Sequence, residues 1–140
     1  MIFHAVIDTN VLVSALLNMH SNPGQILLSI FMGKTIPMLN EEIVNEYREV
    51  LAREKFHFPT EQVAIVLKRI TASGLNLLAQ SNEYPEVVDS KDRCFYAVTM
   101  VGRDAYNAML VTGNLRHFPQ KPFIVTPAQF VSILQKEALD

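Results

Sequence analysis

The chain has 140 residues, a usual length for one domain, and 49% of them are hydrophobic, which excludes a disordered protein. Its formal net charge of −2 argues against a generally basic nucleic-acid-binding protein, so RNA affinity would need a local basic patch and bound cations. The single cysteine, Cys94, excludes an intrachain disulfide and a cysteine-based zinc site. Without a signal-peptide pattern or an apolar run of about 20 residues, we expect a cytoplasmic protein with no membrane segment.

Short apolar segments alternate with amphipathic segments along the chain. The first half predicts, in order, a buried strand at 2–7, a helix at 11–17 capped near Thr9 or Asn10, a loop at 18–24, a helix at 25–33, a strand at 35–39 and a helix from the N-cap Asn40 to about Arg53.

The second half continues the alternation. It predicts a helix at 61–73, a strand at 75–79, a turn at 82–85, a helix from Asp89 to about Val101, strands at 108–112 and 123–125, and a last helix opened by Thr126-Pro127. This pattern is typical of βαβ units, so we expect a three-layer α/β/α fold with a central parallel sheet of about four to five strands. No linker or repeat divides the chain, which predicts a single domain over residues 1–140.

Polar side chains follow two of the predicted strands. Asp8 comes directly after the first strand, and Thr112 to Asn114 end the strand at 108–112. Ligands bind at the carboxyl ends of parallel strands, so both segments are candidates for a site. A carboxylate at Asp8 would be partly buried and would need hydrogen-bond donors or a cation. The alternative for Asp8 is an N-cap of the next helix.

Further acidic residues lie on two predicted helices. At about 100° per residue, Glu46 falls about 40° outside the apolar stripe of its helix, whereas Glu42 and Glu49 lie further towards solvent. Glu46 is therefore either a cover for the edge of the core or a metal carboxylate. Asp89 and Asp92 have the spacing of a capping box, but Asp92 could also point into the cleft.

Converging carboxylates repel one another unless a cation neutralises them. Hard oxygen ligands suit Mg²⁺ or Mn²⁺. Such an ion would lower the pKa of a bound water and hold a phosphodiester, which predicts metal-assisted hydrolysis of a phosphate ester.

Four segments, in order, resemble motifs of the PIN-domain family. They are VIDTNVL at 6–12, EIVNEY at 42–47, DSKDRCFYA at 89–97 and LVTGN at 110–114. The closing IVTPAQF at 124–130 also resembles PIN-family toxins of toxin–antitoxin systems. The resemblance implies an endoribonuclease that uses Mg²⁺ or Mn²⁺ to cleave single-stranded RNA, with an antitoxin protein as partner. Family members often dimerise, and the apolar 25–32 segment could contribute a face to a homodimer.

The resemblance also implies roles for individual residues. It assigns Asp8, Glu46 and Asp92 as catalytic acids, and it assigns metal binding to Asp8, Asp92 and Asn114. Supporting roles fall to Asn10, Asp89 and Thr112. Phosphate contacts are expected from Arg93, Arg116 and Lys121, with Arg103 as a further candidate; for each of them the alternative is an ordinary solvated charge. His117 follows Arg116 and is expected near the cleft.

One position departs from the family pattern. Asn114 stands where the family usually carries an aspartate. An amide oxygen can ligate Mg²⁺ but brings no charge, which predicts weaker binding at a second metal position. The alternative function is therefore a catalytically weakened PIN domain that binds RNA or a protein without cutting.

Other acidic-site α/β folds fit the sequence less well. A haloacid-dehalogenase-like phosphatase needs a second aspartate at the position of Asn10, and a response-regulator receiver needs an aspartate after the third strand, where Gln80-Ser81-Asn82 stand. The sequence contains neither a P-loop nor a GxGxxG fingerprint.

Overall fold

The computed structural model describes residues 1–139, with side chains as far as Glu137. Its centre is a five-stranded sheet in the order β3-β2-β1-β4-β5, and every neighbouring pair is parallel. The strands are β1 (Phe3–Ile7), β2 (Thr35–Leu39), β3 (Leu75–Asn76), β4 (Met109–Val111) and β5 (Ile124–Val125). The predicted α/β class with a parallel sheet is therefore confirmed.

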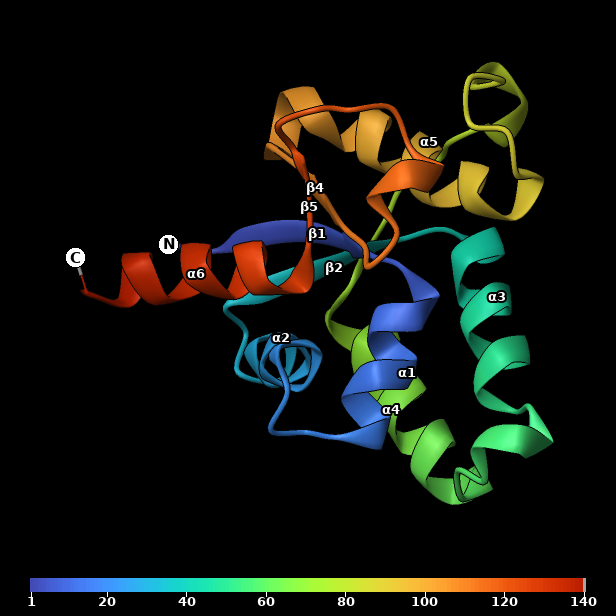
Figure 1. The fold of residues 1–140 in the computed structure, drawn as a ribbon, viewed down its shortest axis with the longest axis vertical. Helices are drawn as coiled ribbons and strands as arrows, with labels where there is room; N and C mark the ends of the chain where they lie inside the picture. The colour runs from blue at the N-terminus through green and yellow to red at the C-terminus, as the bar shows by residue number, and fades with distance from the viewer. Residues whose placement is uncertain (140) are drawn as a thin grey trace.

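Six α-helices surround this sheet in the described part of the chain (Figure 1). The helix α5 (Ser90–Tyr106) packs on β1, β2 and β4, and the 3₁₀ turn η2 (Ser81–Glu83) lies against it. On the opposite face, α2 (Asn22–Phe31) packs with α1 (Thr9–Leu17), α4 (Thr60–Ser73) and α6 (Pro127–Leu139). The helix α3 (Glu41–Leu51) contacts α1, α4 and α5, so it bridges the two helical layers. Two further 3₁₀ turns are η1 (Glu54–Phe56) and η3 (Leu115–His117).

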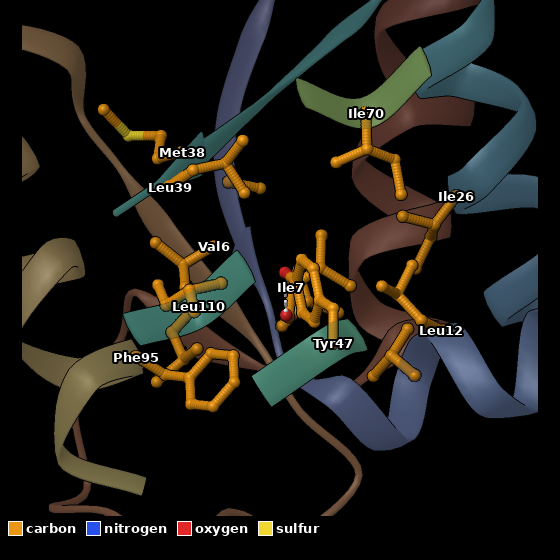
Figure 2. Close-up of a cluster of buried hydrophobic side chains, with 14 of the residues drawn as sticks. Val6, Ile7, Leu12, Ile26, Met38, Leu39, Tyr47, Ile70, Phe95 and Leu110 are labelled. Atoms are coloured by element: carbon orange, nitrogen blue, oxygen red, sulfur yellow. Dashed lines mark hydrogen bonds between the residues drawn. The ribbon is translucent and has the colours of Figure 1, made fainter. Parts of the chain in front are cut away.

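The hydrophobic core lies on both faces of β1. Successive side chains of a strand point to opposite faces, and Figure 2 shows Val6 beside Leu110 and Phe95 on one side, with Ile7 beside Tyr47 and Leu12 on the other. All six side chains are almost completely buried. Two-sided burial explains why the first strand is a continuous apolar run that stops at Asp8.

Local capping chemistry fixes the starts of three helices. The Asn40 side chain accepts a hydrogen bond from the Ile43 N–H at 2.9 Å and opens α3. Asp89 opens α5 in the same way, through the Lys91 N–H at 2.9 Å. The Ser21 hydroxyl accepts a hydrogen bond from the Gly24 N–H at 3.2 Å and opens α2 at Asn22. The predicted loop at 18–24 is therefore wrong in its last three residues, which belong to the helix.

Other element bounds also differ from the prediction. Asp8 itself, rather than Thr9 or Asn10, occupies the N-cap position of α1, although its side chain makes no capping hydrogen bond. The strand predicted at 75–79 is only the two-residue β3. The predicted end of α5 near Val101 is too early, because buried Gly102 continues the helix: a Cβ there would lie 2.9 Å from the Ala108 Cβ, so glycine permits this close approach.

None of the helices in residues 1–139 is long and apolar enough to cross a bilayer.

Candidate active site at the carboxyl end of the sheet

Asp8 is the most buried carboxylate of the candidate site. It directly follows β1, the middle strand, and its backbone N–H donates to the Val111 carbonyl of β4 at 3.0 Å. Only 6% of the residue is exposed. Burial raises the pKa of Asp8, while the Thr112 hydroxyl and the backbone N–H of Thr9 lower it.

Thr112 connects the ends of β1 and β4 through its buried hydroxyl. The Thr112 Oγ1 donates to Asp8 Oδ2 at 2.7 Å and accepts from the Asn114 backbone N–H at 3.0 Å. Asn114 is partly buried. The structure thus brings three of the predicted residues into one hydrogen-bonded group.

Asp92 approaches the same region from the first turn of α5. Its carboxylate Oδ2 is buried. The His117 Nδ1 lies 3.2 Å from this oxygen, which is an ion-pair distance. Burial raises the pKa of Asp92, as do the charges of Asp8 and Asp89, and the nearby His117 lowers it. Asp8 and Asp92 therefore lie close enough to repel each other.

Glu46 lies on α3, beside the first turns of α5. It is half-buried on α3, as its helical position predicts, whereas Glu42 and Glu49 are exposed. Burial and the charge of Glu49 raise the pKa of Glu46; Lys91 and Arg53 lower it, and Asp8 raises it again. We call the surface depression that it lines, about 330 Å³ in volume, the Glu46 hollow; its lining is Glu42, Asn45, Glu46, Glu49, Ser90, Lys91 and Cys94.

A second depression of about 620 Å³ borders Asp92 instead. We call it the Asp92 hollow, and its lining is Glu86, Val88, Asp89, Asp92, Arg116, His117, Phe118 and Pro119. Glu46 and Asp92 thus border different hollows. Among residues 1–139, no three His, Cys, Asp or Glu side chains are close enough together to form a metal-binding cluster. The charge of Asp8 raises the pKa of both Glu46 and Asp92.

Three other predicted residues, Asn10, Asp89 and Arg93, lie at or near the starts of α1 and α5. Asn10 is exposed, and Asp89 is exposed while its side chain caps α5. Arg93 donates from Nε to the Val87 carbonyl at 2.6 Å and from Nη2 to the Val88 carbonyl at 3.2 Å, so it holds the segment before α5.

Two of the residues predicted to contact phosphate face the surface. Arg116 and Lys121 are exposed. Both line a third depression of about 320 Å³, which shares Arg116, Phe118 and Pro119 with the Asp92 hollow. Arg103 instead donates to the Ala108 carbonyl at 2.7 Å and lies over the Phe123 ring.

Sequence reasoning missed the contribution of Tyr47. Its hydroxyl donates to the Ile7 carbonyl at 2.5 Å (Figure 2), which attaches α3 to the residue before Asp8. Burial raises the pKa of this phenol well above its usual value. A tyrosine on a predicted apolar face was the available signal, because a buried phenol hydroxyl normally has a partner.

The oxygen donors suit a hard divalent cation. Asp8 and Asp92 offer carboxylates whose repulsion a cation would relieve. Two carboxylates and an amide would leave the rest of an octahedral shell to water. The residues therefore fit one such ion.

Comparison with known proteins agrees with the motifs and the geometry. The family described as PIN domain has a model that matches residues 4–116. No curated protein matches the chain. PIN domains are generally nucleases, and they typically use divalent metal ions. Because the match runs from β1 into η3 and covers most of the sequence, the chain belongs to the PIN-domain family.

Proposed function

We propose that this PIN domain is a metal-dependent endoribonuclease in which Asp8 and Asp92 hold Mg²⁺ or Mn²⁺. The observation that carries the proposal is the approach of Asp8 to the buried Asp92 carboxylate oxygen: the charge of Asp8 raises the pKa of Asp92, and His117, 3.2 Å away, offsets this only in part. Two carboxylates held close together in a buried site cost free energy unless a cation neutralises them. Proteins keep such costly arrangements mainly where a ligand or a reaction uses them.

Each residue of the proposed site then has its own role. The Thr112 hydroxyl fixes the orientation of the Asp8 carboxylate. Asn114 supplies a neutral oxygen in place of the usual carboxylate. A divalent cation held here supplies positive charge that neutralises the carboxylates and makes water a better nucleophile. Glu46 is the third catalytic acid of the proposal; because it borders a different hollow from Asp92, it would orient the attacking water from the α3 side. The water oxygen would bond to phosphorus as the P–O bond to the leaving oxygen breaks, and the leaving oxygen would take up the proton that the water loses.

The surface beside Asp92 supports RNA as the substrate. Arg116 and Lys121 place two exposed positive charges on the segment after β4. Both line a depression of about 320 Å³ that shares Arg116, Phe118 and Pro119 with the Asp92 hollow. A single strand lying in these depressions would contact cations with its phosphates and apolar side chains with its bases.

The biological setting that we propose is a toxin–antitoxin pair in the cytoplasm, with an antitoxin protein that neutralises the nuclease. This part rests on the resemblance of the closing segment 124–130 to PIN-family toxins. A homodimer is part of the proposal, and exposed Leu28 and Met32 on and beside α2 offer an apolar face for it.

Cleavage of a mixed RNA pool tests the enzymatic proposal. The purified protein is incubated with RNA and Mn²⁺, and the products are compared with those of Asp8→Asn, Asp92→Asn and the control Asp104→Asn. Asp104 is exposed on α5 and lines neither hollow. We expect metal-dependent cleavage by the wild type and the control, and losses of 100-fold or more (an order-of-magnitude expectation) for the other two variants. Identical traces for wild type and Asp8→Asn would disprove the proposal.

Asn114 favours one alternative function. With one carboxylate fewer than the usual family site, the domain could bind RNA or a protein without cutting it. In that case the mixed pool would be retained on the protein but left intact in Mn²⁺, and Asn114→Asp would generate cleavage.

A further inference from the structure

The Asp92 hollow combines apolar, acidic and basic walls. Val88, Phe118 and Pro119 are apolar, whereas Arg116 and His117 offer cationic or hydrogen-bonding nitrogens. Its volume of about 620 Å³ is within the range of about 300–1,000 Å³ usual for small-molecule sites. A nucleotide needs an apolar surface for its base and polar groups for its phosphate, and the hollow provides both beside Asp92.

Glu86 is the feature of this hollow that hydrolysis does not require. Among residues 1–139 it makes no hydrogen bond or ion pair, so both carboxylate oxygens are available. Asp89, the other acidic residue of the wall, already uses one oxygen to cap α5. Glu86 lies close enough to Tyr96 to raise the pKa of that phenol, after the larger effect of burial.

The segment that carries Glu86 is held in place by α5. Arg93 binds the carbonyls of the next two residues, Val87 and Val88. The Val87 side chain is completely buried, and the Val87 N–H donates to the Tyr84 carbonyl at 3.3 Å. The wall of the hollow is therefore anchored on both sides of Glu86.

A free carboxylate distinguishes among the four RNA bases. Guanine presents two adjacent donors, N1–H and N2–H, which match the two carboxylate oxygens. Uracil presents one donor between two carbonyls, and adenine and cytosine each place an acceptor beside their amino group. Only guanine thus satisfies both oxygens without setting an acceptor against a negative charge.

We propose that the Asp92 hollow is a guanine-selective subsite for the nucleotide beside the scissile phosphate, with Glu86 as the residue that selects the base. This inference rests on the proposed ribonuclease function, because it takes RNA as the substrate.

Binding of mononucleotides tests the subsite without any cleavage. GMP, AMP, CMP and UMP are titrated by NMR into Asp8→Asn protein in EDTA, and the same titrations are made after adding Glu86→Gln or the control Glu83→Gln. Glu83 is exposed on η2 and does not line the hollow. We expect GMP to bind about tenfold more tightly than UMP. We expect Glu86→Gln to abolish this ratio and Glu83→Gln to keep it. Equal affinities, or a ratio unaffected by Glu86→Gln, would overturn the proposal.

Sequencing the ends of cleaved RNA separates the two proposals. If the wild type cuts RNA without a fixed guanine beside the cut, the subsite is wrong and the nuclease stands. If RNA stays intact while GMP still binds selectively to the Asp8→Asn protein, the nuclease is wrong and the base-selective hollow stands.

Discussion

Replacing Thr112 with valine tests the connection between the ends of β1 and β4. Valine keeps the shape of the side chain and removes the hydroxyl, which donates to Asp8 Oδ2 at 2.7 Å and accepts from the Asn114 N–H at 3.0 Å. Thr112 is completely buried, so water cannot replace the lost partner directly. The substitution therefore leaves a carboxylate oxygen and a backbone N–H each one hydrogen bond short.

The expected cost follows from these two bonds. A hydrogen bond to a charged group contributes about 1.5–3 kcal/mol, and one between neutral groups about 1 kcal/mol. Allowing for relaxation, we expect Thr112→Val to lower the free energy of unfolding by about 2–4 kcal/mol. With an unfolding entropy of about 2.1 cal/mol/K per residue, this loss corresponds to a decrease in Tm of about 7–14 °C.

The pH dependence of this loss identifies its cause. The hydroxyl lowers the pKa of Asp8, so it stabilises the ionised carboxylate more than the protonated one. The difference between wild type and Thr112→Val should be largest near pH 8 and should shrink as the pH falls through the pKa of Asp8. Urea unfolding followed by circular dichroism in EDTA measures it, with Thr112→Ser as the control that keeps the hydroxyl. A difference of the same size at every pH, or none at all, would refute the reasoning.

Three other substitutions test separate parts of the site. Burial raises the pKa of Asp8 in the folded state. The folded protein therefore loses stability as the pH rises through that raised pKa, because the buried carboxyl group must then ionise. We expect Asp8→Asn to raise the Tm of the metal-free protein at pH 8 but not near pH 4; equal shifts in Tm at both pH values would contradict this. Tyr47→Phe removes the hydrogen bond to the Ile7 carbonyl and should lower the free energy of unfolding by about 1–2 kcal/mol, measured in urea; an unchanged midpoint would count against it. Asn114→Asp adds a carboxylate and should tighten Mn²⁺ binding about tenfold in calorimetry, and an unchanged Kd would show that residue 114 does not contact the ion.

Local chemistry made much of the fold predictable. The strand before Asp8 is buried on both faces and therefore reads as an unbroken apolar run. Asn40 and Asp89 are helix caps whose hydrogen bonds span only two or three residues, so the sequence contains the whole interaction. The missed start of α2 has the same local origin: Ser21 is the cap, and a proline in the first turn was available as the signal.

The arrangement of the site depends on tertiary contacts that no local pattern contains. The wheel position of Glu46 predicted its partial burial but not that it borders a different hollow from Asp92. That separation is set by how α3 packs against α5. The position of His117 beside Asp92 depends in turn on the path of the chain after β4. The separation of Glu46 from Asp92 and the position of His117 both depend on how far apart separate elements lie, and no single segment of the sequence encodes that.

The bond between Thr112 and Asp8 joins residues that are 104 positions apart in the chain. Ribosomes add roughly 5–20 residues per second, so Asp8 is synthesised about 5–20 s before the hydroxyl that it needs. Throughout that interval the nascent polypeptide has its first carboxylate but neither β4 nor the buried partner beyond it. Premature termination before β4 would therefore release a product without this arrangement, however much of the earlier fold it retained.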